Sequence, residues 1–498
     1  MHRLIKRPKS VERDLDTLST IDTKGLISRR ELMRRSTMFG AAATLSTFGG
    51  VLSAAGAEGR GKVTVGLDSG AFTPILKTFA PEFKAAAGIE VEFASYPLGN
   101  MYDQNLLALR QGTARFDVFD FWPNFVGDFG PYLTPLEEVG KLEQLNFSDI
   151  AKPFQQLNIY ENKIVGVTID GDMFINAYRT DLFENEQEKQ AFKSKYGYDL
   201  APPKTYKNYR DTAEFFTRPD KNLYGLVEVT SFFVYAFFIN HFVQLGSEKG
   251  VRYGELFDDH MKPKLLGEIG EEALRRYKDL TAFMPKDLAL AMPWDVGRQI
   301  FFDGRVAQAN WWTDMPKGAS DPKISKVAGK IKCAHSFGDV TILPYGRAMG
   351  IAGNSKNKEG AFKVIAWIQQ SANANRWVAE TFEQSLMDPW RTSMFDNPKD
   401  TFPLQAQSGF ADNFASVSKA QLASQKVYLD ISIPGTNRYL ASMMQHVPRA
   451  LTGQATPKEA LQAMTAEFEE TTETYGRDRQ IRHYDQYRQR MIKQGYWS

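Results

Sequence analysis

From Lys62 onward, runs in which every second residue is apolar alternate with runs in which apolar residues recur at helical spacing. The first strand-like run lies at residues 63–67, a helical run follows at 75–83, and Gly88 closes that helix. Alternation then resumes, which completes one βαβ unit. A second unit of the same construction ends in an apolar strand at residues 117–122. This order predicts layered α/β architecture with a largely parallel sheet.

Later segments repeat both patterns. The sequence predicts a strand at residues 163–169, a helix at 206–216, a strand that ends at 311–312 and a charged surface helix at 477–493. The aromatic run at 232–242 has two interpretations, a wall that faces a ligand and a buried core helix. The second interpretation is favoured for the run as a whole, because aromatic side chains are most often buried.

The first 57 residues have the features of an export signal. Two arginine pairs, Arg29-Arg30 and Arg34-Arg35, precede an uncharged run at 36–57 that ends in the small residues Ala55-Gly56-Ala57. We expect a twin-arginine-like signal that is cleaved near Ala57 to release a periplasmic protein. A retained membrane anchor is the alternative, because the run has about the 20-residue length that a bilayer requires. Its many Gly, Ser and Thr residues lower its hydrophobicity and favour cleavage.

The charge distribution argues against a nucleic-acid partner. The net charge is +2, but the first 57 residues hold ten basic and five acidic side chains, which leaves residues 58–498 close to −3. Binding to nucleic acid needs a concentrated basic face, and the excess positive charge here lies in a removable leader.

The usual signatures of catalysis and of metal or phosphate binding are absent from the sequence. It contains no HExxH, no CxxC, no phosphate loop ending in Lys-Ser or Lys-Thr, and no GxGxxG after a strand. The six histidines are scattered along the chain, and Cys333 is the only cysteine. The sequence therefore predicts no catalytic residue, no metal site and no cofactor.

Carboxylates and indoles stand where the predicted strands end. These residues are Asp68, Asp120, Trp122, Asp170, Asp172, Trp311 and Trp312. In open α/β sheets, ligands gather beyond the carboxyl ends of the strands. Carboxylates accept hydrogen bonds from hydroxyl groups, and aromatic faces cover the C–H patches of a sugar ring, so this set suits a polyhydroxylated ligand. Taken singly, each Asp could instead cap a helix and each Trp could fill the core.

Five short segments, in this order, resemble family 1 extracellular solute-binding proteins, the periplasmic sugar-binding components of ABC importers. The segments are 116–122 leading to 133–136, 162–167 leading to 178–183, 302–307, 350–352 with 355–357, and 450–453 followed by 457–461. The resemblance extends from about residue 62 to about residue 474. The insertion at 247–270 and the charged tail lie outside it.

The resemblance implies a fold, a function and a partner. The fold is the type II periplasmic-binding-protein fold, with two α/β lobes around a hinged cleft. Lobe I is expected at residues 58–171 plus 346–400, and lobe II at 172–345 plus 401–498. The chain should cross between lobes near 170–174, near 341–349 and a third time after the helices that follow Pro389. A monomer of this kind would carry a sugar to a membrane permease by cleft closure and perform no chemistry.

The resemblance also implies site residues. Family members place an aromatic residue where Trp122 stands, an acid at Asp172, aromatics in the second lobe and a late aromatic near Tyr439. The second-lobe aromatics are matched here by Phe232, Tyr235, and Trp311 or Trp312. Arg347 and Arg391 are added on chemical grounds, because arginine donates hydrogen bonds to ring and hydroxyl oxygens. Arg347 lies in a segment where the family often has Gly-Gly, so it could enter the cleft or brace the hinge.

Other ligands and one other class of function remain open at this point. A polyol, a polyamine or a phosphorylated small molecule could replace the sugar. Two arginines are few for a phosphate, whereas the acidic and aromatic candidates leave a polyamine possible. The competing class is an exported carbohydrate hydrolase, in which Asp170 and Asp172, or Asp120, would serve as acid and base.

Overall fold

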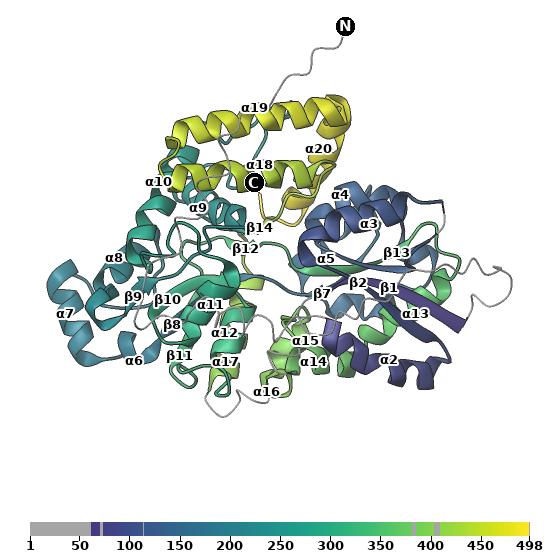
Figure 1. Ribbon diagram of the computed structural model, residues 1–498, viewed down its shortest axis with the longest axis horizontal. Coiled ribbons are helices and arrows are strands. Elements are labelled where there is room, and N and C mark those ends of the chain that lie inside the picture. Colours follow the sequence, from purple (N-terminus) through teal and green to yellow (C-terminus); the bar gives the residue numbers. More distant parts are fainter. Residues whose placement is uncertain (1–60, 70–72, 113, 381–384, 403–408, 498) are drawn as a thin grey trace, which may run out of the picture. The chain divides into compact units, whose positions relative to one another are not determined.

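Two larger β-sheets organise the chain (Figure 1). The computed structural model describes residues 61–69, 73–112, 114–380, 385–402 and 409–497. The expected leader and its cleavage site near Ala57 lie outside these ranges. Residues 57–498 form one compact unit, and both sheets belong to it.

The first sheet has six strands in the order β2-β1-β3-β13-β4, with β7 paired to β13. The strands are β1 (Lys62–Asp68), β2 (Glu90–Tyr96), β3 (Val118–Phe121), β4 (Leu133–Thr134), β7 (Val167–Asp170) and β13 (Arg347–Ala352). Helices α2 (Thr73–Ala87), α3 (Met101–Arg110) and α13 (Lys358–Ile368) pack against it. The predicted strand at 163–169 is split into β6 (Lys163–Ile164), which pairs with β5 (Ile159–Tyr160), and β7.

The second sheet has four strands in the order β11-β8-β10-β9. These are β8 (Phe174–Arg179), β9 (Tyr224–Leu226), β10 (Val306–Trp312) and β11 (Ile331–His335). Helices α8 (Tyr206–Phe216) and α17 (Phe410–Leu422) pack on it. The aromatic run forms α9 (Val234–Glu248), whose residues from Val234 to Gly246 are all buried, which agrees with the core interpretation.

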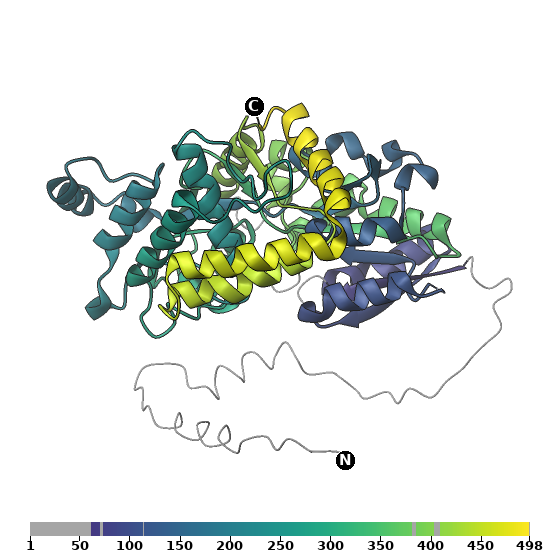
Figure 2. The same ribbon diagram turned by 90° about the horizontal axis from the view of Figure 1, so that it is seen from above.

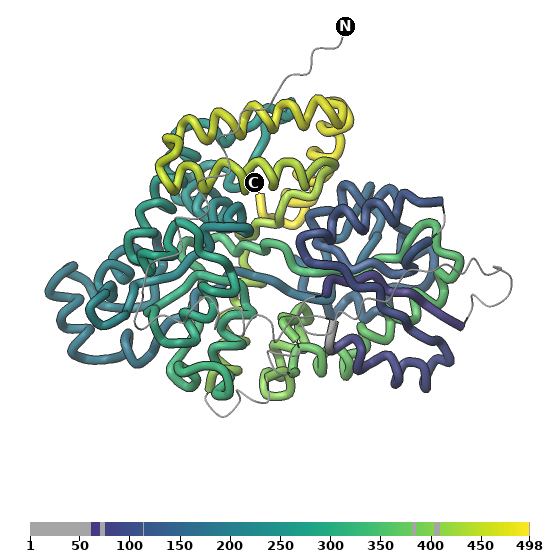
Figure 3. Tube along the Cα trace, in the orientation of Figure 1, coloured from purple at the N-terminus to yellow at the C-terminus, as the bar shows by residue number. Residues whose placement is uncertain are grey.

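The prediction of a largely parallel sheet is wrong beyond the first βαβ units. Strands β1, β2 and β3 are parallel, but β13 runs antiparallel to β3, β4 and β7. In the second sheet, β8 runs antiparallel to both β10 and β11. The reason is the path of the chain, which leaves the first sheet at Asp170, enters the second at Phe174 and returns at Arg347. Figure 3 shows the tube of the chain passing between the two sheets. Because β8 and β13 each start at the crossing, they run opposite to the strands that end there.

The C-terminal helices lie side by side in both views (Figure 2). Helices α18 (Thr436–Leu451) and α19 (Pro457–Tyr475) pack on each other and on α10 (Glu268–Leu280), and α18 also packs on α9. The charged tail forms α20 (Arg477–Lys493), the predicted surface helix, and buries Tyr484 and Tyr487 against its neighbours. Arg477 also donates a hydrogen bond to the carbonyl oxygen of His260, so the insertion at 247–270 packs against this tail.

The described chain also contains further α-helices and strands. They are α4 (Val126–Phe129), α5 (Lys152–Gln155), α6 (Thr180–Phe183), α7 (Glu186–Tyr196), α11 (Trp294–Phe302), α12 (Asp314–Ala319), α14 (Ser371–Ala379), α15 (Thr392–Asp396), α16 (Pro398–Thr401), and the paired strands β12 (Thr341–Leu343) and β14 (Val427–Leu429). Within the ranges given above, no helix has both the length and the apolar character that crossing a bilayer requires.

Candidate ligand-binding cavity

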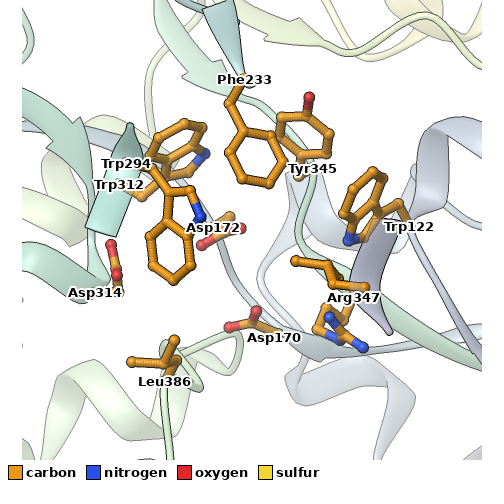
Figure 4. A pocket seen from close by; sticks show the side chains of 11 residues that line it. Trp122, Asp170, Asp172, Phe233, Trp294, Trp312, Asp314, Tyr345, Arg347 and Leu386 are labelled. Atoms are coloured by element: carbon orange, nitrogen blue, oxygen red, sulfur yellow. The ribbon is translucent and has the colours of Figure 1, made fainter. Parts of the chain in front are cut away.

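A cavity of about 90 Å³ lies where strands of the two sheets end. Its walls are formed by Leu98, Trp122, Asp170, Asp172, Phe233, Trp294, Trp312, Asp314, Tyr345, Arg347 and Leu386. A single water needs roughly 10–15 Å³ of such space, so this cavity has room for a small molecule. Figure 4 shows Trp122 and Arg347 on one side, Trp294, Trp312 and Asp314 on the other, and Asp172 between them.

The direction of the strands brings these side chains together. Trp122 follows β3, Asp170 is the last residue of β7 and Trp312 is the last residue of β10. Arg347 is the first residue of β13, the strand that starts at the crossing. Strands that run toward the crossing therefore contribute their last residues to the cavity, and the strand that leaves it contributes its first residue.

Aromatic rings from both sheets meet around Phe233. Its ring centroid lies 5.1 Å from that of Tyr345, 5.7 Å from Trp312 and 5.9 Å from Trp122. Trp122 also packs edge-on against Tyr345, with 4.7 Å between the ring centroids. Edge-to-face contacts of this kind are favourable in themselves, so the rings form an apolar wall with a defined geometry.

The turn between β12 and β13 places Tyr345 and Arg347. Tyr345 and Gly346 both have left-handed backbone conformations, with φ of 65° and 70°. A side chain at Gly346 would meet the carbonyl oxygen of Asp170 at 2.9 Å, so this position requires glycine. The left-handed conformation of Tyr345 is strained, and strain of this kind concentrates at functional sites.

Arg347 forms ion pairs with Asp68 and Asp120, and all three side chains are almost fully buried. Its Nε lies 2.9 Å from Oδ1 of Asp120. Burial raises the pKa of Asp120 to about 6, although the guanidinium opposes the shift. Burial works against the charge of Arg347, but the two carboxylates outweigh it and raise the pKa of the guanidinium. Arg347 thus ties the end of β1 and the end of β3 to the start of β13.

A second group of acids surrounds the crossing. One carboxylate oxygen from each of Asp170, Asp172 and Asp388 can be chosen so that all three lie within 4.8 Å of one another. Oδ1 of Asp170 accepts a 2.6 Å hydrogen bond from the backbone amide of Asp388, and Oδ2 of Asp172 accepts one of 3.1 Å from Gly346. Oδ2 of Asp388 accepts a 2.6 Å bond from the hydroxyl of Thr313. In the part of the chain that the structure describes, no Lys or Arg forms an ion pair with these three acids.

This carboxylate cluster, Asp170, Asp172 and Asp388, has perturbed acidity. Burial raises the pKa of Asp170 to about 7. Burial and the neighbouring carboxylates raise the pKa values of Asp172 and Asp388 well above the usual range. Histidine and cysteine patterns, on which the sequence prediction of no metal site rests, do not reveal that these three aspartates meet here.

Two basic residues lie beside the cluster. Nη1 of Arg298 forms an ion pair of 2.7 Å with Oδ2 of Asp314, the first residue of α12. Nζ of Lys317 donates hydrogen bonds to the carbonyl oxygens of Ser385 and Met387, and burial lowers its pKa to about 8. Lys317 therefore fastens the segment that carries Leu386 and Asp388 to α12.

Five of the predicted site residues line the cavity: Trp122, Asp170, Asp172, Trp312 and Arg347. The structure does not bring the other six to it. Asp68 lies in the ion pair behind Arg347. Trp311 lies in the core against Phe237, because neighbouring residues of a strand point to opposite faces.

The remaining four predicted residues have other surroundings. Phe232 is 49% exposed and borders a separate surface groove. The hydroxyl of Tyr235 donates a 2.7 Å hydrogen bond to Asp430, and that of Tyr439 bonds Thr472 at 3.0 Å. Arg391 is buried and donates to backbone carbonyl oxygens, which include those of Leu145 and Gln369.

Sequence reasoning missed several cavity residues: Leu98, Phe233, Trp294, Asp314, Tyr345, Leu386 and, in the cluster, Asp388. Asp314 comes two residues after Trp312, so the strand-end argument could have included it. Phe233 is the neighbour of Phe232, and choosing between them requires knowing where α9 begins. Leu386 and Asp388 lie in a loop without periodicity, and no pattern in the sequence indicates them.

The sequence model of the bacterial extracellular solute-binding protein family matches residues 69–375. The chain belongs to this family. A probable amino-acid ABC transporter periplasmic-binding protein of Sinorhizobium fredii is 25% identical over 321 residues, which cover 62% of this chain and 68% of that protein.

Solved structures of ABC transporter solute-binding proteins have a similar fold. One, from Agrobacterium vitis S4 with bound D-mannitol, is 19% identical and covers 83% of this chain and 99% of that one, with a TM-score of 0.66. Another, from Agrobacterium radiobacter K84 in complex with ribitol, is 21% identical and covers 82% of this chain and 98% of that one, with a TM-score of 0.65. These likenesses confirm the predicted fold class, the type II periplasmic-binding-protein fold.

Proposed function

We propose that this protein binds a sugar or polyol in the cavity between its two sheets and delivers it to the membrane permease of an ABC importer. The observation that supports this most strongly is the lining of the cavity, where carboxylates and indoles from strand ends of both sheets converge. Carboxylates accept hydrogen bonds from hydroxyl groups, and indole faces cover C–H surfaces. The ribitol and mannitol in the similar solved structures are polyols.

Ligand binding is coupled to cleft closure in this proposal. We assign residues 58–171 plus 346–400 to lobe I, and 172–345 plus 401–498 to lobe II. The short crossings at 171–173 and 344–346 would serve as the hinge. A solute that touches Trp122 on one side and Trp312 on the other stabilises the closed form, because only that form makes both contacts.

The cellular location and the oligomeric state of the protein are part of the same proposal. Export would use the leader at residues 1–57, with cleavage near Ala57, and the mature protein would act in the periplasm as a monomer. The family description as extracellular solute-binding proteins supports this location.

A carrier fits the cavity better than a hydrolase does. The two carboxyl groups of a glycosidase stand roughly 5–5.5 Å or 6.5–9.5 Å apart, according to its mechanism. Oxygens of Asp170, Asp172 and Asp388 lie within 4.8 Å of one another, and Asp170 and Asp388 are joined through a backbone amide.

A thermal-shift screen tests the proposal. Residues 58–498 would be melted with ribitol, D-mannitol, D-glucose and maltose, and with amino acids because of the name of the Sinorhizobium relative. A ligand at about 100 times its Kd stabilises the folded state by about 2.7 kcal/mol, which raises the melting temperature by several degrees. We expect at least one sugar or polyol to do so, without cleavage of a labelled oligosaccharide. Stabilisation by amino acids alone would refute the assignment.

A further inference from the structure

The charges around the cavity do not balance. The acids that face it or lie directly behind it are Asp68, Asp120, Asp170, Asp172, Asp314 and Asp388, and the basic groups are Arg298, Lys317 and Arg347. Arg347 pairs with Asp68 and Asp120, and Arg298 pairs with Asp314. Lys317 donates its hydrogen bonds to backbone carbonyls. Within the described residues, the carboxylate cluster is therefore left without an ion-pair partner.

Two carboxylate oxygens beside the cavity also lack a hydrogen-bond donor. Oδ1 of Asp388 and Oδ1 of Asp314 are buried, and neither has a partner among the residues that the structure describes. Asp388 and Asp314 are 0% and 7% exposed. Buried polar atoms are nearly always satisfied, so these acceptors indicate donors that a bound molecule would bring.

An ammonium group complements this set of acceptors better than a hydroxyl group. A hydroxyl brings one donor and two lone pairs, and the lone pairs would face further carboxylate oxygens. An ammonium brings three donors, no acceptor and a positive charge. It therefore satisfies the orphaned acceptors and neutralises the cluster at the same time.

The walls of the cavity favour an organic cation over a metal ion. Calcium takes six to eight oxygen ligands, whereas the rings of Phe233, Trp294, Trp312 and Tyr345 occupy much of the lining here. The same rings attract an organic ammonium by cation–π interaction when it lies within about 6 Å of their centroids. Figure 4 shows Asp172 between these rings and Asp170.

We infer that the solute carries an ammonium group, held by the carboxylate cluster and the aromatic rings beside it. This inference rests on the proposed function and narrows its ligand class to amino-substituted polyols and sugars. The hydroxyl groups of such a solute would extend toward Trp122 and the unpartnered indole N–H of Trp312, for which the described residues provide no acceptor.

A matched pair of ligands tests this inference by calorimetric titration of residues 58–498. D-Glucitol and 1-amino-1-deoxy-D-glucitol differ only in a hydroxyl replaced by an amine. We expect the amine to bind at least tenfold more tightly near neutral pH, since a hydrogen bond between an ammonium and a carboxylate is stronger than one from a neutral hydroxyl. Equal or weaker binding of the amine overturns the inference, as does calcium binding at the cluster that excludes the amine.

The same titration distinguishes failure of the inference from failure of the proposed function. Binding of D-glucitol or another neutral polyol without a preference for the amine refutes the ammonium site and leaves the proposed function standing. Binding of spermidine, with no sugar or polyol of either kind, retains the ammonium site and refutes the assignment to sugars and polyols. If no probe binds, both are refuted.

Proton release provides a second readout. Titrations of the amine in two buffers of different ionisation enthalpy should show protons leaving the protein on binding, because the cation favours the charged carboxylates. The groups that titrate or exert charge there are Asp170 on β7, Asp172 at the crossing, Asp314 and Lys317 on α12, Asp388 in its loop, Arg298 on α11 and Arg347 on β13. Absence of proton release for a tightly bound amine contradicts the inference.

Asp172→Asn should weaken binding of the amine at least tenfold. It should also remove most of the preference of the protein for the amine over D-glucitol. Asp172→Glu retains the charge and should retain the preference. Asp412→Asn removes one negative charge from the exposed surface of α17 and should leave both affinities within about twofold. A preference for the amine that survives Asp172→Asn, in a variant that melts cooperatively, overturns the role given to Asp172.

Discussion

Two sets of aspartates adjoin the same cavity, and they differ in how their charge is balanced. Asp68 and Asp120 share the guanidinium of Arg347. Asp170, Asp172 and Asp388 form no ion pair within the described chain, and their pKa values are raised by burial. In the sequence, Asp68, Asp120 and Asp170 occupy the same kind of position, the end of a strand. Their roles therefore do not follow from their position in a strand. An acid that has an arginine partner holds strands together, whereas an acid without one is available to bind a ligand.

The two sets of aspartates therefore affect the stability of the folded protein in different ways. A buried carboxylate in an ion pair strongly destabilises the folded protein only when its basic partner is removed. Carboxylates that are buried together without a cation destabilise the ligand-free protein themselves. Unbalanced acids of this kind are therefore more common at functional sites than elsewhere.

The largest effect is expected when the paired set loses its arginine. Arg347→Met leaves Asp68 and Asp120 buried without a cation and should lower the free energy of unfolding by about 3–5 kcal/mol. Urea denaturation followed by circular dichroism measures this loss. Arg347→Lys retains the charge without the forked donors, so its loss should be smaller. A loss below about 1 kcal/mol for Arg347→Met would show that the pairing contributes little.

The next effect concerns the aromatic wall. Trp122→Ala removes one face of the cavity and should weaken binding of the best ligand by about 2 kcal/mol, or roughly 30-fold. Phe232→Ala removes an aromatic ring that the sequence also suggested but that lies outside the cavity. Its Kd should stay within about twofold of the parent value. Equal losses in the two variants would contradict the position assigned to the ligand.

The smallest effect is on the free energy of unfolding of the ligand-free protein. The same substitution, Asp to Asn, should change it in opposite directions in the two sets. Asp172→Asn should raise the free energy of unfolding by about 1 kcal/mol near pH 7.5, because it removes an unbalanced charge. Asp68→Asn should lower the free energy by about 1–3 kcal/mol, because Arg347 loses part of its pairing. Urea denaturation of the two variants side by side checks both signs.

The gain from Asp172→Asn should depend on pH. The folded-state pKa of Asp172 is raised, so the folded protein binds its proton more tightly than the unfolded chain does. The carboxylate therefore costs stability only above its unfolded pKa of about 3.9, and the cost grows as pH rises toward the folded value. Near pH 4 the parent protein and the Asp172→Asn variant should be equally stable. A gain of the same size at both pH values would rule out titration of Asp172 as its cause.

Much of the fold could be predicted from the sequence, because local patterns define it. The bounds of α8, α20 and the end of β10 agree with periodicity and turn residues. The antiparallel strands could not be predicted, since the direction of β8 and β13 depends on where the chain crosses.

The candidate site was predictable only in part. Strand ends indicated Trp122, Asp170, Asp172 and Trp312. The choice between Trp311 and Trp312 requires the face of β10, which a strand buried on both sides does not reveal through its apolar pattern. Asp388 reaches the cluster from a loop whose position depends on Thr313 and Lys317, more than 60 residues away in the chain.

The most direct test is a crystal structure of residues 58–498 grown with the ligand that stabilises the protein most. We expect this ligand to lie between Trp122 and Trp312 with a polar group in contact with Asp172. A ligand found instead in the surface groove beside Phe232 and Met444, with the cavity unchanged, would contradict it.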